Sequence, residues 1–218
     1  MSAMQRPPGF YGKLPAVGDF VHRRLPETFV EPWHAAMQGL LSATGAAITT
    51  PEYHPPVWRF VLLPGLAGTV AWAGTMRASV DRVGRAFPLV IAAPLTANAA
   101  NGTTTDAATP TDLRLPAWLD AADTVLSNIG AGRQQDGTWL DQACMAFVQQ
   151  QRKHASPLAV PLLADPTTAG SSLWWTAMTG SPPGVCLRIA GWPAACCHAS
   201  VLLGSWYAPS ARLAQELQ

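Results

Sequence analysis

Three charged residues, Asp81, Arg82 and Arg85, lie within five positions of a chain in which charge is scarce. Asp, Glu, Lys and Arg make up 12% of its 218 residues, against about 25% in an average soluble domain. A carboxylate beside two guanidinium groups can form a buried ion pair, bind an anion or face a partner, because the planar fork of arginine pairs with carboxylate and phosphate. These residues are the first candidates for a functional site.

Three further charged residues lie in neighbouring motifs. Lys13 and Asp19 belong to the run GFYGKLPAVGDF (residues 9–20), and Arg59 lies inside the apolar run VWRFVLL. The pattern places Lys13 at the end of a strand, and Gly18 permits a tight turn that aims Asp19 inward or across at an arginine. The complete set of candidate site residues is Lys13, Asp19, Arg59, Asp81, Arg82 and Arg85.

Three interpretations of these six residues stay open. In the first, one of the two aspartates pairs with one of the three arginines and joins the N-terminal loop to the sheet. Breaking a buried pair of this kind costs about 3–5 kcal/mol, which is reason enough for a fold to keep it. In the second, the arginines form a surface that faces a partner protein. In the third, the cluster lines a pocket for a small ligand or a hydrolytic site.

The sequence contains none of the familiar short motifs of catalysis or phosphate binding. Gly12 and Lys13 are followed by Leu14, whereas a Walker loop needs an upstream glycine and a hydroxyl residue after the lysine. A G-x-S-x-G nucleophile elbow is absent, and the histidines show neither H-E-x-x-H nor H-x-H spacing. We therefore expect no enzymatic activity and no cofactor. A ligand-binding or hydrolytic enzyme that uses the Asp81 group is the alternative.

The four cysteines predict neither a disulfide framework nor a metal site. Cys196, Cys197 and His198 are adjacent in the chain. Adjacent side chains of one helix point in different directions, whereas zinc needs four converging ligands. A vicinal cysteine pair beside small apolar residues is typical of packing in a reduced compartment. We therefore expect no bound metal.

The composition indicates a folded protein without a long-range electrostatic field. Hydrophobic residues make up 49% of the chain, nine residues are Trp, and the formal net charge is +1. Such a protein does not steer nucleic acid or an anionic membrane toward itself. The N-terminus lacks the apolar stretch of a secretory signal, and the longest nearly apolar run, residues 87–95, is far shorter than the roughly 20 residues of a membrane helix. We expect a cytoplasmic protein that binds neither nucleic acid nor membrane, and its oligomeric state is left open.

Hydrophobic periodicity predicts helices mixed with short strands. Apolar residues recur at three- and four-residue steps in the segments 27–43, 116–129 and 138–152. Apolar, β-rich runs bounded by turn signals predict strands at 57–63, 68–74, 87–93, 171–178 and 184–189.

The remaining segments complete a single-domain prediction. Residues 98–112 are rich in Thr, Asn and Ala and are expected to form a flexible loop, and residues 193–203 are expected to form a closing helix. A hairpin followed by helical pairs and late strands predicts an α+β fold over residues 1–218. In this fold, helices sandwich a mostly antiparallel sheet in three layers.

Several ordered motifs resemble the TagF (ImpM) accessory proteins of bacterial type VI secretion systems. The resemblance is carried by GFYGKLPAVGDF, by VWRFVLLPG, by Trp72-x-Gly74 and by SVDRVGRAFPL. It is strong over residues 9–95. It is looser in the second half, where Gly-Trp-Pro stands in place of the expected Gly-Leu-Pro.

This resemblance implies a regulator and not an enzyme. TagF-like proteins are cytoplasmic negative regulators of type VI secretion assembly that act after translation. The resemblance implies a partner as well, a cytoplasmic scaffold protein of the same system that carries a forkhead-associated domain. The family fold, a sheet sandwiched by helices, agrees with the pattern of elements.

Overall fold

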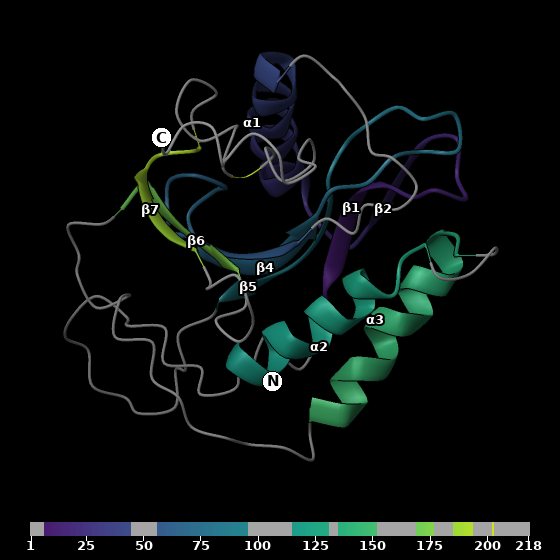
Figure 1. Ribbon diagram of the computed structural model, residues 1–218. Helices are drawn as coiled ribbons and strands as arrows, with labels where there is room; N and C mark the ends of the chain where they lie inside the picture. Colours follow the sequence, from purple (N-terminus) through teal and green to yellow (C-terminus); the bar gives the residue numbers. More distant parts are fainter. Residues whose placement is uncertain are drawn as a thin grey trace, which may run out of the picture.

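The computed structural model describes residues 7–44, 56–95, 115–130, 135–151, 169–176, 185–193 and 202. Within these ranges seven strands form one sheet in the order β2-β1-β5-β4-β3-β6-β7, and each neighbouring pair is antiparallel (Figure 1). The strands are β1 Gly9–Lys13, β2 Phe20–Arg23, β3 Val57–Leu62, β4 Ala71–Arg77, β5 Leu89–Leu95, β6 Ser171–Thr176 and β7 Cys186–Ala190. The helices are α1 Glu27–Thr44, α2 Leu115–Ser127 and α3 Gly137–Gln151. The predicted α+β class and antiparallel sheet are confirmed.

Alternating side chains give the sheet two different apolar faces. In β3, Trp58 and Phe60 belong to the cluster that includes α1, whereas Val61 belongs to the cluster that includes α2 and α3. This alternation follows from the two-residue period of a strand. Figure 1 shows α1 on one side of the sheet and α2 and α3 on the other. Strands β1, β4 and β5 are therefore buried on both faces, whereas the edge strands β2 and β7 are largely exposed.

The face that meets α1 is built from large aromatic rings. The centroids of Phe29 and Trp72 lie 4.7 Å apart, and those of Trp33 and Phe60 lie 5.0 Å apart. Trp174 of β6 packs against Phe60 at 5.2 Å. Each such ring buries a large apolar surface, so these contacts dominate the packing of α1 on the sheet.

The opposite face includes small residues of β4 and β5, which leave room for α2. Ala71, Ala73 and Ala93 share its buried cluster with Trp118 and Leu119 of the helix.

Within the described residues, no helix has the length and apolarity needed to cross a membrane.

Polar groups define two of the helix ends. The Nη1 atom of Arg77 donates to the carbonyl oxygens of Leu126 at 2.7 Å and of Ser127 and Ile129 at 3.2 Å. These carbonyls end α2 and have no partner inside the helix. At the start of α3, Asp136 Oδ1 accepts hydrogen bonds from the backbone N–H groups of the second and third helical residues, which is the geometry of an N-cap.

The structure reproduces most of the predicted elements. The helices at 27–43, 116–129 and 138–152 and the five predicted strands are confirmed with boundaries shifted by up to three residues. The predicted loop at 98–112 and the cysteine–histidine run at 196–198 lie outside the described residues. The predicted helix at 193–203 lies almost entirely outside them too.

Gly74 of β4 is required by a close approach of two neighbouring groups. A Cβ atom at this position would lie 2.4 Å from the ring of Phe60 and 2.5 Å from the carbonyl oxygen of Ile91. One contact is a packed aromatic ring and the other is backbone of the adjacent strand, so neither can move freely. The glycine lets Phe60 lie flat against the sheet beneath α1.

We predict that Gly74→Ala lowers the free energy of unfolding by about 1–3 kcal/mol, because the added methyl group overpacks the sheet. The control is Gly39→Ala in α1, where an added Cβ meets nothing within 4 Å. That substitution should raise the stability by about 0.5–1 kcal/mol, since alanine favours a helix over glycine. Urea unfolding of both variants measures the two effects. Equal stability of Gly74→Ala and wild type would contradict the packing described for β4.

Candidate functional site

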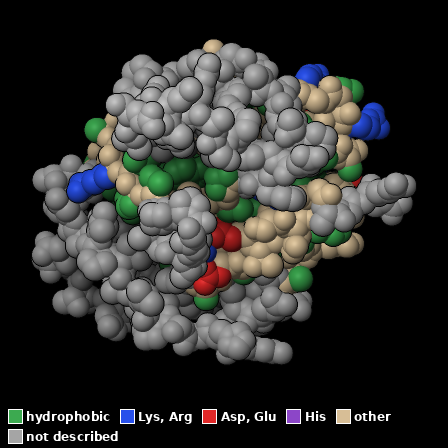
Figure 2. Space-filling model, viewed as in Figure 1, with side chains coloured by type: hydrophobic (Ala, Val, Ile, Leu, Met, Phe, Trp, Pro, Cys, Tyr) green, Lys and Arg blue, Asp and Glu red, His purple; other side chains and the backbone are tan. Residues whose placement is uncertain are grey.

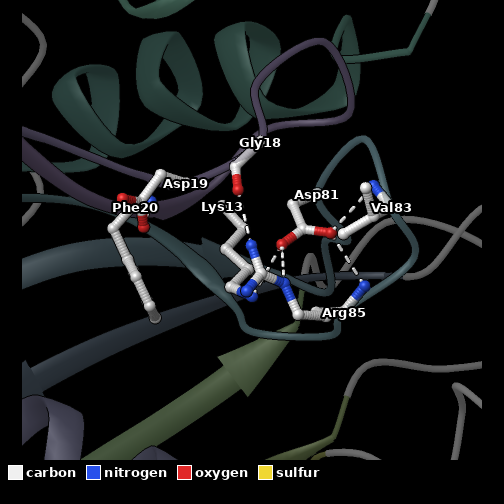
Figure 3. Close-up of polar contacts among 7 residues, drawn as sticks. All are labelled: Lys13, Gly18, Asp19, Phe20, Asp81, Val83 and Arg85. Carbon is white, nitrogen blue, oxygen red and sulfur yellow. Dashed lines mark hydrogen bonds and ion pairs between the residues drawn. The ribbon is translucent and has the colours of Figure 1, made fainter.

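The carboxylate of Asp81 is buried and accepts four hydrogen bonds (Figure 3). Its Oδ2 atom accepts from Lys13 Nζ at 2.8 Å and from Arg85 Nε at 2.7 Å. Its Oδ1 atom accepts from the backbone N–H groups of Val83 at 3.0 Å and Arg85 at 2.8 Å. A carboxylate offers about four lone-pair positions, so this side chain is fully satisfied within the protein.

The same carboxylate shapes the loop that contains it. Val80 and Ala86 form an isolated antiparallel bridge, and the Asp81 backbone N–H donates to the Arg85 carbonyl at 3.0 Å. Gly84, with φ +85°, donates its N–H to the Asp81 carbonyl at 3.0 Å. A positive φ of this size suits glycine best. The loop 81–85 is therefore a closed turn whose interior is the Asp81 side chain.

Two further bonds fasten this loop to the N-terminal segment. The Arg82 backbone N–H donates to the Val17 carbonyl at 2.9 Å, and Arg85 Nη2 donates to the Gly18 carbonyl at 2.5 Å. Together with the Lys13–Asp81 pair, they join the end of β1 and the following turn to the loop that precedes β5. Residues 68 positions apart in the sequence are thus held together by charge.

The electrostatics of the loop favour the ionised carboxylate. Burial acts to raise the pKa of Asp81, but the hydrogen bonds from Lys13, Arg85 and Val83 outweigh it and hold that pKa well below its usual range. Lys13 is itself buried, and its Nζ lies 5.1 Å from the centroid of the Phe20 ring. The ion pair is therefore shielded from water on the Lys13 side.

The structure brings four of the six predicted site residues together and places the other two, Asp19 and Arg59, elsewhere. Lys13, Asp81 and Arg85 come together, and the backbone of Arg82 joins them. The prediction that Asp19 turns inward or across at an arginine is wrong. Its side chain lies at an exposed position, and its Oδ1 accepts a hydrogen bond from the next backbone N–H, that of Phe20, at 2.8 Å.

Arg59 belongs to a second cluster on the face that α2 covers. Its Nε donates to Asp123 Oδ2 at 2.7 Å and its Nη2 to Asp120 Oδ1 at 2.6 Å. Burial raises the pKa of Asp123 to about 6, because it outweighs the attraction of Arg59 and acts together with the like charge of Asp120. The second oxygen of Asp123 is buried without a hydrogen-bond partner among the described residues.

This second cluster was not predicted from the sequence. Asp120 and Asp123 are three positions apart and so lie on one side of α2, opposite a single arginine in an otherwise apolar strand. The spacing of the two aspartates could have indicated a charged site on the helix. It identifies Arg59 as their partner only once α2 is known to pack across β3. In Figure 2, the acidic side chains of the face seen there gather mainly near its centre and are not spread evenly.

The end of the loop 81–85 projects into solvent. The side chain of Val83 is 68% exposed, and that of Arg85 is 61% exposed although its Nε reaches Asp81. Arg82 is exposed and lies across Gly18, where a Cβ atom would be 3.3 Å from its Nη2. We call the residues Arg82, Val83, Gly84 and Arg85 the tip.

An apolar groove of about 1000 Å³ lies elsewhere, between the start of α1 and the β3–β4 turn. Its walls include Pro8, Pro26, Val70, Trp72 and Pro94. None of the six predicted site residues lines it. The charged cluster and the groove are therefore separate features of the surface.

The comparison with known families is decisive for the class of protein. Residues 9–146 match the model of a family described as the TagF N-terminal domain, Type VI secretion system-associated. The chain belongs to this family. The matched range contains β1 to β5, α2 and both charged clusters, so the resemblance noted in the sequence is confirmed.

A solved structure similar to this TagF-family chain is that of PA0076 from Pseudomonas aeruginosa PAO1. The two share 29% sequence identity with a TM-score of 0.62, and the match covers 90% of this chain and 94% of the other. No curated protein matches the chain. The similarity therefore extends over nearly the whole length, beyond the family range.

We predict that Asp81→Asn lowers the melting temperature at pH 7 by about 10 °C, because it leaves Lys13 and Arg85 without their anion. The pKa of Asp81 is depressed in the folded chain, so its contribution is present above the ordinary carboxyl pKa of about 4 and is lost as the pH falls further. The difference between wild type and variant should be constant from about pH 5 to 8 and narrow below about pH 4.

The control for this measurement is Asp19→Asn, which alters an exposed aspartate of the same region. It should change the melting temperature by no more than about 2 °C. Similar losses for the two variants, or a loss for Asp81→Asn that grows below pH 4, would refute the assignment of Asp81 as the buried anion.

Proposed function

We propose that this protein is a post-translational negative regulator of type VI secretion that acts by binding and not by catalysis. Its partner in this proposal is a cytoplasmic scaffold protein with a forkhead-associated domain. The observation that carries the proposal is the family match over residues 9–146, whose description associates the family with the type VI secretion system.

The chemistry of the Asp81 loop supports a role without turnover. A general acid or base must exchange a proton near the working pH. The pKa of Asp81 is held well below its usual range, and its four lone-pair positions are occupied by donors of the protein itself. A hydrolytic site built on Asp81 would have to break these bonds first.

Two further features of the described residues are poorly suited to chemistry, the buried thiol of Cys144 and the apolar groove beside Trp72. Burial raises the pKa of the Cys144 thiol to about 12, so little nucleophilic thiolate forms at neutral pH. The groove beside Trp72 is lined mainly by proline, alanine and valine, and its one charged residue, Arg24, is already paired with Asp141. These features favour the regulator over the enzyme.

Regulation by binding requires only that the protein occupy a surface that the active assembly needs. The fraction of scaffold withheld then depends on the concentration of the regulator relative to its dissociation constant. A sheet whose strands β1, β4 and β5 are buried on both faces suits this task, because a preformed surface loses little entropy on binding.

The proposal is tested with the purified chain and the purified forkhead-associated scaffold of the same bacterium. Isothermal titration calorimetry should show saturable binding, and a strain that overproduces the chain should secrete less through the type VI system. A strain that overproduces an unrelated protein to the same level is the control. Absence of binding together with unchanged secretion would refute the proposed function.

A further inference from the structure

The tip combines the most exposed apolar side chain of the described residues with free positive charge. Four large hydrophobic residues are exposed among the described residues, and Val83, at 68%, is the most exposed of them. A single exposed valine is ordinary on a protein surface. Val83 differs from the other three because it lies at the end of a loop between Arg82 and Arg85.

Hydrogen bonds to its backbone hold the tip in one conformation. Asp81 binds the backbone N–H groups of Val83 and Arg85, and the Arg82 N–H is bound by the Val17 carbonyl. Figure 3 shows the Asp81 carboxylate between the side chains of Lys13 and Arg85 on one side and the Val83 backbone on the other. A loop fixed in this way binds a partner without the entropic cost of ordering it.

The charges of the tip are available to a partner. Among the described residues, the Arg82 guanidinium has no hydrogen bond or ion pair, and the Arg85 side chain keeps 61% of its surface exposed. Arginine is the residue best suited to bind carboxylates at an interface, because its planar fork makes two parallel hydrogen bonds. The fork of Arg82 is open to a partner, whereas Arg85 already binds Asp81 and the Gly18 carbonyl and offers a partner only its remaining exposed N–H groups.

We propose that the tip is the docking surface of this protein, and that it inserts into a shallow apolar depression bordered by carboxylates on the partner. This inference rests on the proposed function, because it takes that partner to be the forkhead-associated scaffold. Val83 seats in the depression and excludes water, while Arg82 and Arg85 pair with the carboxylates. Asp81 and Lys13 position the tip without touching the partner.

A protein partner fits these residues better than a phosphate surface does. Nucleic acid offers the arginines charge, but its phosphates give the valine no apolar seat. One valine beside two arginines is too small an apolar and basic surface to hold a protein on an anionic membrane. Binding of nucleic acid also draws on many basic groups at once, whereas the chain carries a formal net charge of +1. The arginines should supply most of the affinity, because arginine is enriched among the residues that dominate interfaces and valine is not.

The test measures the affinity of the full chain for the purified scaffold and, in parallel, the repression of secretion in cells. We expect Arg82→Glu to weaken binding at least tenfold and Val83→Ser to weaken it several-fold. Arg188→Glu on β7 and Val70→Ser on the β3–β4 turn are matched controls, since both alter exposed residues of the same types elsewhere. Circular dichroism and melting temperature establish that all four variants fold.

Salt dependence supplies a second readout. Wild-type affinity should fall as NaCl rises from about 0.05 to 0.3 M, and this fall should be smaller for Arg82→Ala. Phosphatidylserine vesicles and duplex DNA then replace the scaffold in the same measurement. Neither should show binding to the wild-type chain that the Arg82→Glu variant has lost. If vesicles or DNA bind the wild-type chain and Arg82→Glu removes that binding, the partner is not a protein and the inference is overturned.

The outcomes separate the inference from the proposed function. If wild type binds the scaffold and only the tip variants lose binding and repression, both are supported. If the tip variants bind as wild type does, the docking inference is wrong and the proposed function stands. If wild type represses secretion without binding the scaffold and the tip variants do not repress, the tip is the docking surface and the named partner is wrong. If wild type does neither, both are overturned.

Discussion

The arrangement of the N-terminal half depends on one buried carboxylate and the donors around it. Removing a charge from water is costly unless hydrogen bonds and an opposite charge replace the lost hydration. Asp81 receives both from Lys13 at the end of β1 and from Arg85 in its own loop. The other oxygen of the same carboxylate accepts hydrogen bonds from two backbone N–H groups. The position of the end of β1 against the loop 81–85 and the shape of that loop are therefore consequences of the same buried carboxylate.

The rest of the structure distributes its few charges by the same rule. On the face under α2, Arg59 binds two helix carboxylates, and Arg77 binds the carbonyls that end that helix. On the face under α1, aromatic rings pack directly, and Gly74 leaves room for Phe60. Polar contacts at Arg59 and Arg77 thus add to the apolar packing of α2, whereas large aromatic rings dominate the packing of α1. Arg82 differs from these arginines because its guanidinium has no hydrogen bond or ion pair among the described residues, and this makes it a candidate for binding.

Long periodic segments were predictable from the sequence, and contacts between distant segments were not. The three helices and the hairpin of β3 and β4 follow from local spacing, because each carries its own apolar pattern. Strand β2 was missed, since its four residues have too short a pattern to detect. The cluster of Arg59 depends on which helix crosses which strand, and Asp19 was misplaced because the adjacent backbone N–H competes successfully for its carboxylate. Because charged residues are scarce in this chain, the sequence did predict that Asp81 has a definite role.

The central claim is that Asp81 fixes the conformation of the tip, and amide hydrogen exchange tests it most directly. Although Val83 is an exposed loop residue, its N–H and that of Arg85 donate to a buried carboxylate. Both amides should exchange at least about tenfold more slowly than those of an open loop. Lys13→Met should speed their exchange while β3 and β4 keep their protection. Exchange at the rate of an unstructured peptide in wild type would contradict the account.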